Sequence, residues 1–76
     1  MTVYGLVKTF SLGDVLSIGV YRDLKTAREE MINQVEKRRE ELGEEVHEFS
    51  VESRTAKVYY DGGCLAEYWK IVPCKL

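Results

Sequence analysis

The sequence has little proline, histidine and cysteine, and it has no excess of positive charge. It has one proline among 76 residues, of which 45% are hydrophobic and 32% are charged. This composition excludes a disordered chain and is typical of a globular protein. The formal net charge is −2. Proteins that bind DNA or RNA usually carry a basic face, so the overall charge argues against that class.

Two cysteines and one histidine are too few for a disulfide scaffold or a zinc site. Cys64 and Cys74 are expected on one extended strand, where about 33 Å would separate them. That distance excludes a disulfide between them, and we expect two half-buried free thiols. His47 is the only histidine, so a zinc ligand set cannot be completed. We expect no metal and no cofactor.

Long apolar runs are also absent. No run approaches the roughly 18–20 residues that a membrane-spanning helix requires. The first residues lack the basic segment and the apolar segment of a signal peptide. We therefore expect a cytoplasmic protein with no membrane partner.

Residues 24–42 show the clearest pattern in the chain. Apolar side chains recur there at helical spacing and fall on one stripe: Leu24, Ala27, Met31, Val35 and Leu42. Asp23 is suited to cap the first turn, because its carboxylate can accept hydrogen bonds from free backbone N–H groups. Gly43 is suited to end the helix, because it adopts a positive φ without a Cβ clash. The sequence predicts one long helix with one apolar side.

The segments on both sides of this helix predict strands. Residues 2–10 and 15–21 are expected to form a hairpin that turns Leu16, Ile18 and Val20 toward the helix. Three further strands are expected near residues 47–52, 54–60 and 64–72, with Pro73 ending the last one or lying on an edge. The predicted fold class is α+β, one domain over residues 1–76. Its element order is ββαβββ, a mostly antiparallel sheet with the helix packed on one face.

No group of residues predicts catalysis. His47 shares the register of Phe49 and Val51, so we expect a half-buried side chain, and no serine or cysteine is placed to pair with it. The segment 61–63, Asp-Gly-Gly, lacks the glycine spacing and the following helix of a phosphate loop, and it predicts a hairpin turn. We expect a protein without enzymatic activity and without catalytic residues.

Acidic residues gather from the end of the helix onward. No Lys or Arg lies between residues 40 and 53, and the segment holds Glu40, Glu41, Glu44, Glu45, Glu48 and Glu52. Carboxylates near a helix C-terminus are disfavoured by the helix dipole. These residues are either a solvated helix end and strand face, or an acidic patch that binds a basic partner surface.

Aromatic residues cluster on both sides of the last turn. Adjacent residues of a strand point to opposite faces, so one member of each pair, Tyr59–Tyr60 and Tyr68–Trp69, is expected on the face without the helix. The candidate aromatic sheet face comprises Tyr21, Tyr59, Tyr60, Tyr68 and Trp69. It is either an exposed tyrosine surface or a surface for a partner or a dimer, because Tyr and Trp are frequent interface anchors.

The segment that joins the hairpin to the helix reads Ile18-Gly-Val-Tyr-Arg-Asp-Leu-Lys-Thr-Ala-Arg-Glu-Glu-Met. It resembles the hairpin-to-helix unit of small phage and bacterial proteins, most of which are uncharacterised. Some similar phage proteins inhibit host defence, anti-CRISPR proteins among them. The resemblance covers about residues 1–42. It implies a protein that acts in a host cytoplasm, and it assigns no functional residue.

The sequence therefore favours a protein that binds another protein, and the resemblance makes an inhibitor of a bacterial defence complex its most specific form. Two alternatives stay open. One is a small structural homodimer joined through the uncovered sheet face. The other is a nucleic-acid-binding accessory protein that uses one of two basic groups of the helix region: either Arg22, Lys25 and Arg28, or Lys37, Arg38 and Arg39.

Overall fold

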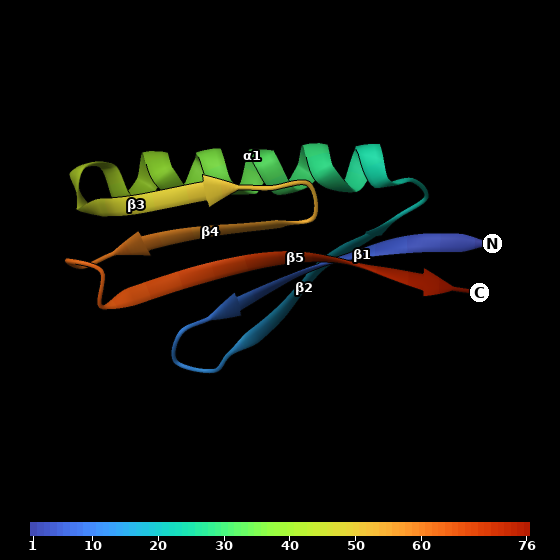
Figure 1. The fold of residues 1–76 in the computed structure, drawn as a ribbon, viewed down its shortest axis with the longest axis horizontal. Coiled ribbons are helices and arrows are strands. Elements are labelled where there is room, and N and C mark those ends of the chain that lie inside the picture. The colour runs from blue at the N-terminus through green and yellow to red at the C-terminus, as the bar shows by residue number, and fades with distance from the viewer.

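The computed structural model describes residues 1–76 and has one helix packed on a five-stranded sheet (Figure 1). Its elements in chain order are β1 (Thr2–Phe10), β2 (Val15–Tyr21), α1 (Leu24–Leu42), a short 3₁₀ turn η1 (Gly43–Glu45), β3 (Val46–Val51), β4 (Thr55–Tyr60) and β5 (Leu65–Lys75). The predicted α+β class and ββαβββ order are confirmed.

The strands lie in the order β2-β1-β5-β4-β3, and every neighbouring pair is antiparallel. The two strands from opposite ends of the sequence, β1 and β5, pair from Thr2 opposite Lys75 to Phe10 opposite Glu67. This pairing places the N- and C-termini side by side (Figure 1). The two edges of the sheet are β2 and β3.

The helix α1 begins and ends at the predicted caps. The Asp23 carboxylate accepts a hydrogen bond from the Thr26 N–H at 2.7 Å, and this bond lowers the pKa of Asp23. Gly43 has φ 57°, and its N–H donates to the Arg39 carbonyl, which is a helix end that glycine adopts readily. The helix is not apolar enough to cross a membrane.

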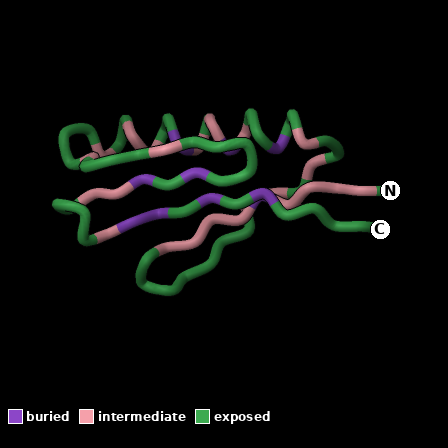
Figure 2. The backbone as a smooth tube through the Cα atoms, viewed as in Figure 1, coloured by how far each residue is buried: buried purple, intermediate pink, exposed green.

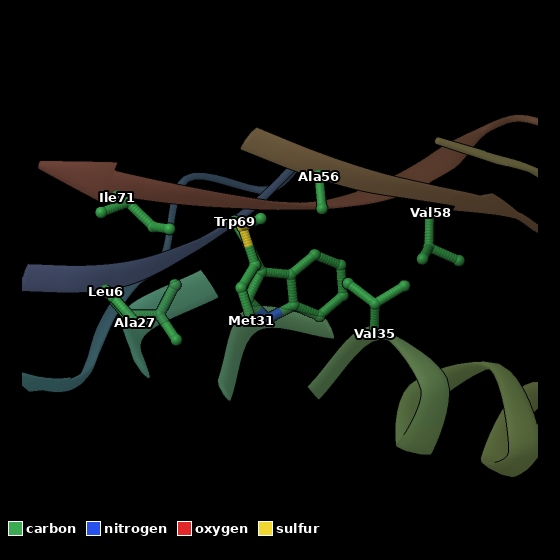
Figure 3. Packing of buried hydrophobic residues seen from close by; sticks show 8 residues of the cluster. All are labelled: Leu6, Ala27, Met31, Val35, Ala56, Val58, Trp69 and Ile71. Atoms are coloured by element: carbon green, nitrogen blue, oxygen red, sulfur yellow. The ribbon is translucent and has the colours of Figure 1, made fainter. Parts of the chain in front are cut away.

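The core lies between α1 and the middle of the sheet (Figure 2). The predicted helical stripe is buried at Ala27, Met31 and Val35. It packs on Leu6, Ala56, Val58, Trp69 and Ile71, with the Trp69 indole at the centre of the cluster beside Met31 (Figure 3). The stripe therefore closes the core, as its spacing predicted.

β2 does not present the apolar face that its alternation predicts. Gly19 pairs with Leu6 and Ser17 pairs with Val7, which leaves Ile18 as an extra residue in a β-bulge. Ile18 packs against the core, but Val20 turns to the other face and is 67% exposed, and Leu16 is 51% exposed. The predicted face was wrong at Val20, because the extra residue reverses the alternation of the strand. Leu16 pairs with Lys8 and keeps the predicted face, but it is not buried there.

Pro73 lies within β5 and does not end it. The Ile71 N–H donates to the Arg54 carbonyl on the β4 side of the strand. Pro73, two residues further on, faces the same side at a point where β4 has not yet begun. Its missing N–H is therefore directed to an unpaired edge, which was the second of the two predicted positions.

Candidate functional site: the open face of the sheet

The helix covers one face of the sheet, and we call the opposite side the open face. Residues that pair across antiparallel strands point to the same face, and Leu6, Trp69 and Ile71 mark the covered one. The alternate positions lie on the open face: Val3, Gly5, Val7, Thr9, Val15, Ser17, Val20, Glu48, Ser50, Thr55, Lys57, Tyr59, Ala66, Tyr68, Lys70, Val72 and Cys74.

The structure divides the five residues of the candidate aromatic sheet face between the two faces, with one member of each adjacent pair on the open face, as alternation predicted. Tyr59 and Tyr68 lie on the open face, with ring centroids 6.2 Å apart in an edge-to-face arrangement. Trp69 is 1% exposed beneath α1, and Tyr60 and Tyr21 also lie on the covered side. The prediction is corrected for these three residues. Alternation sends one member of each pair to the core, and the bulge at Ile18 turns Tyr21.

A buried ion network lies on the covered side, and the sequence pattern did not indicate it. Glu67 is 0% exposed. Its carboxylate lies 2.6 Å from the Lys8 ammonium and 2.9 Å from Arg38 Nε. The Lys8 ammonium is also 4.8 Å from the Trp69 ring centroid, and the Arg38 guanidinium is 5.5 Å from the Tyr60 ring centroid. The network joins β1, β5 and α1.

The network sets the ionisation of its members. Burial acts to raise the pKa of Glu67, but interactions with Lys8, Tyr60 and Arg38 outweigh it, so the pKa lies below its ordinary value. Burial and the neighbouring Glu67 raise the pKa of Tyr60. Tyr21 behaves similarly, because burial and Glu30 raise its pKa. At neutral pH the buried carboxylate is therefore charged and both phenols are neutral.

The predicted acidic patch is divided along the chain. Glu40 and Glu41 lie at the end of α1, and Glu41 accepts a hydrogen bond from Arg38 at 3.2 Å. Glu44 and Glu45 form η1 and line a hollow with His47 and Asp61. Glu48 lies on β3 opposite Tyr59, on the open face. Glu52 follows β3 at its far end, where it accepts a hydrogen bond from the Thr55 hydroxyl at 3.4 Å. Only Glu44, Glu45, Glu48 and Glu52 lie along β3 or at its ends, so the six residues do not form one compact patch.

The basic residues considered for nucleic acid do not converge on one surface. Arg38 is held in the Glu67 network, and the Arg39 guanidinium lies 3.6 Å from the Phe49 ring centroid. Lys37 borders a hollow that also contains the Glu67 and Glu41 carboxylates. The remaining three are exposed around the start of α1: Arg22, Lys25 and Arg28.

Two expectations of burial were also wrong. His47 is exposed, because it is the extra residue of a bulge between Val46 and Glu48 on the β3 edge. Cys64 and Cys74 are free thiols, as expected, but both are exposed. Asp61 has φ 53°, and the segment 61–63 forms the predicted turn between β4 and β5. No group of His, Cys, Asp or Glu is arranged to hold a metal ion.

One half of the open face is apolar. Gly5 lies between Val20 of β2 and Val72 of β5 and is flanked along β1 by Val3 and Val7. We call these five residues the valine patch. Val20 is 67% exposed and Val72 is 36% exposed. A Cβ built on Gly5 would meet one atom within 4 Å, the Val72 carbonyl oxygen at 3.8 Å. The centre of the patch therefore has room for another side chain.

The other half of the open face is polar and aromatic. A hollow of about 340 Å³ lies there over four strands. Its open-face side chains are Thr9, Ser50, Thr55, Lys57, Tyr68 and Lys70, and we call it the lysine–tyrosine hollow. A hydrogen bond with Tyr59 raises the pKa of Tyr68. Neither lysine is paired with a carboxylate, in contrast to Lys8.

No protein-family model, no curated protein and no solved structure matches this chain.

Proposed function

We propose that this chain is a non-enzymatic binding protein that contacts another protein through the valine patch and the adjoining edge of β2. One observation carries the proposal. The corner of the sheet formed by β1, β2 and the end of β5 is apolar, uncharged and uncovered. Val20 belongs both to the patch and to the edge strand, so the two features form one continuous surface.

The valine patch supports a contact that buries apolar side chains. Isolated exposed apolar residues are normal, but a contiguous set is typical of interaction sites. The four valines surround Gly5 across three strands. A partner side chain placed over Gly5 would contact several of them, and each fully buried valine stabilises a contact by about 1.5 kcal/mol or more. The patch therefore offers both area and a position for an anchor residue.

The two edges of the sheet differ in a way that favours β2 as the contact edge. An edge strand has unpaired N–H and C=O groups, which can pair with a strand of another protein. Charged side chains on an edge discourage such pairing. β2 has no charged residue between Val15 and Tyr21, whereas β3 carries Glu48, follows Glu44 and Glu45, and precedes Glu52. We infer that the acidic residues keep the β3 edge unpaired and that β2 remains available.

The bulge at Ile18 favours a partner of different sequence over a second copy. Two copies of β2 would pair antiparallel about a two-fold axis. With the axis at Ile18, Val15 of one copy would face Tyr21 of the other, yet these side chains point to opposite faces of the sheet. In a symmetric pair of β2 strands, residues opposite each other would therefore point to different faces of the sheet, and the pairing could not continue along the whole strand. A different strand is free of this constraint.

The expectation of a bacterial defence complex as the partner comes from the resemblance over residues 1–42 and stays a prediction. The valine patch narrows the chemistry of any such partner. It favours an extended apolar segment, and it disfavours the basic groove that the acidic residues alone would favour.

A comparative pull-down tests the proposal. Val20→Lys combined with Val72→Lys would place two charges in the patch, and we expect partner proteins recovered from a bacterial lysate by the wild-type chain to be lost, as quantified by mass spectrometry. Leu12→Lys is the matched control, because Leu12 is 84% exposed in the β1–β2 turn, outside the patch. Circular dichroism checks that each variant is folded.

Two further results decide between surfaces. Reversal of Glu44, Glu45 and Glu48 to Lys should leave the recovered proteins unchanged if the valine patch is the contact. The proposal is wrong if the charged patch variant recovers the same proteins as the wild type. It is also wrong if sedimentation shows a wild-type dimer that the patch variant converts to a monomer, because the occupant would then be a second copy.

A further inference from the structure

The lysine–tyrosine hollow is a second site on the open face, separate from the valine patch. Register brings its members together from four strands. Tyr68 pairs with Thr9 on one side and with Lys57 on the other, Lys57 pairs with Ser50, and Lys70 pairs with Thr55. All of these side chains therefore point to the same side of the sheet. The volume of about 340 Å³ lies within the usual range for small-ligand sites, about 300–1,000 Å³.

The charges of the hollow are available for a ligand. Lys57 and Lys70 are exposed and form no ion pair in the protein. They lie diagonally across β4 and β5, with Tyr68 beside Lys57 and Thr55 beside Lys70. Lysine binds phosphate as a point charge. Two ammonium groups with the neighbouring hydroxyls of Thr9 and Ser50 form a suitable environment for a phosphate, whereas the Thr55 hydroxyl donates to Glu52.

The aromatic part of the hollow indicates what accompanies the phosphate. Tyr68 is 36% exposed, and the Tyr59 ring meets it edge to face at 6.2 Å. An exposed ring on a sheet is a platform on which a base can stack. A simple anion would leave this ring unused, and so would a peptide made only of acidic residues, because its side chains contain no flat ring.

We propose that the lysine–tyrosine hollow binds a nucleotide unit, with its phosphate between Lys57 and Lys70 and its base stacked on Tyr68. The unit comes either from a free nucleotide or from a single strand of nucleic acid, since both supply the same phosphate and base. This site differs from the basic residues of the helix region that the sequence singled out. It shares no residue with the valine patch, although Lys70 pairs with Val7 at the border between them, so different variants test the two proposals.

The Glu52 carboxylate opposes this binding. It also lines the hollow, where it accepts a hydrogen bond from the Thr55 hydroxyl. A carboxylate near a phosphate weakens the binding of that phosphate by like-charge repulsion. With a net charge of −2 on the chain, we expect binding to be weak and to weaken further as salt rises.

The test is an NMR titration of the full chain at low salt with four probes: inorganic phosphate, adenosine monophosphate, a short single-stranded oligothymidylate and a poly-glutamate peptide. We expect adenosine monophosphate to shift the amides of residues 57, 68 and 70. Tyr68→Ala should weaken its binding about tenfold, the value of one stacked base. Lys57→Gln combined with Lys70→Gln should weaken it about tenfold or more, and Glu52→Gln should strengthen it.

The matched control is Lys25→Gln combined with Lys75→Gln, which changes the net charge equally at two exposed residues outside the hollow. We expect this control to bind like the wild type. Tighter binding of the oligonucleotide than of the mononucleotide, with a steeper salt dependence, identifies a nucleic-acid strand. Equal binding per nucleotide identifies a free nucleotide.

Four results would overturn the proposal. Inorganic phosphate could bind as tightly as the mononucleotide, with no effect of Tyr68→Ala. The poly-glutamate peptide could be the only probe that shifts the hollow. The control variant could lose as much affinity as the hollow variant. The fourth result is that no probe shifts the amide signals of residues 57, 68 and 70. None of these results bears on the valine patch, so the two proposals fail separately.

Discussion

Tyr68 and Trp69 are neighbours in β5, yet they lie in opposite environments. Trp69 is 1% exposed and contacts the helix, whereas Tyr68 is 36% exposed and faces away from it. Tyr59 and Tyr60 in β4 also point to opposite faces, although both are half-buried. The covered face contains the apolar core and the Glu67 network, and the open face contains neither. One face therefore holds the fold together, which leaves the other available for binding.

Because the two faces differ in this way, we expect substitutions on them to change different free energies, that of unfolding and that of binding. Substitutions on the covered face should change the free energy of unfolding strongly and binding only through loss of the fold. Substitutions on the open face should change the free energy of unfolding little and binding strongly. Pairs of adjacent residues test the division, because the strand and its backbone pairing are the same for both members.

The largest effect is expected from Trp69→Ala. Removal of a buried tryptophan side chain destabilises a domain by about 3–5 kcal/mol, which approaches the whole free energy of unfolding of a chain this small. Tyr68→Ala should lower the free energy of unfolding by about 1 kcal/mol or less. Urea unfolding followed by circular dichroism measures both. Trp69→Phe keeps a folded reference if the alanine variant does not fold. Equal destabilisation by the two alanine variants would contradict the division.

The next effect is expected from Glu67→Gln. This change leaves Lys8 and Arg38 without their carboxylate, and loss of one partner of a buried ion pair destabilises a protein by about 3–5 kcal/mol as an upper range. Glu48→Gln, on the exposed β3 edge, is the control and should change stability by less than about 0.5 kcal/mol. Thermal unfolding at neutral pH compares them.

The pH dependence of stability follows from the same carboxylate. The pKa of Glu67 is lowered in the folded state, so its contribution is fully present above the ordinary pKa of glutamate, about 4.3, and is lost as the pH falls through the folded-state value. We expect the wild-type chain to lose stability in that acidic range and Glu67→Gln to lose less there. Parallel pH profiles of the two chains would contradict this origin.

The sequence predicted the elements of the fold better than the direction of individual side chains. Helical spacing located α1, and the caps at Asp23 and Gly43 located its ends. The alternation in β2 gave the wrong face for Val20, because the bulge at Ile18 adds one residue that no pattern of apolar residues reveals.

The candidate site was harder to predict for a related reason. The sequence indicated that one aromatic of each adjacent pair would be exposed, but only strand order and register identify Tyr59 and Tyr68. Likewise, Lys57 and Lys70 are thirteen positions apart and meet in one hollow only because β4 pairs with β5. The Glu67 network depends on contacts between residues 8, 38 and 67, and a single sequence contains no signal for such distant contacts.

The smallest effect is expected from two glycines in adjacent strands. Gly19 lies on the covered face, where an added Cβ would be 2.8 Å from the Tyr21 hydroxyl oxygen. Because that ring end can shift, Gly19→Ala should lower the free energy of unfolding by about 1 kcal/mol. Gly5 lies on the open face with free space above it, and valine favours a strand, so Gly5→Val should raise stability by up to about 1 kcal/mol. Urea unfolding measures whether each substitution raises or lowers stability.

Gly5→Val also fills the centre of the valine patch. A chain that is more stable but has lost its protein partner would therefore separate folding from binding within one substitution. A destabilised Gly5→Val chain would mean that the open face is packed more tightly than its exposed valines indicate.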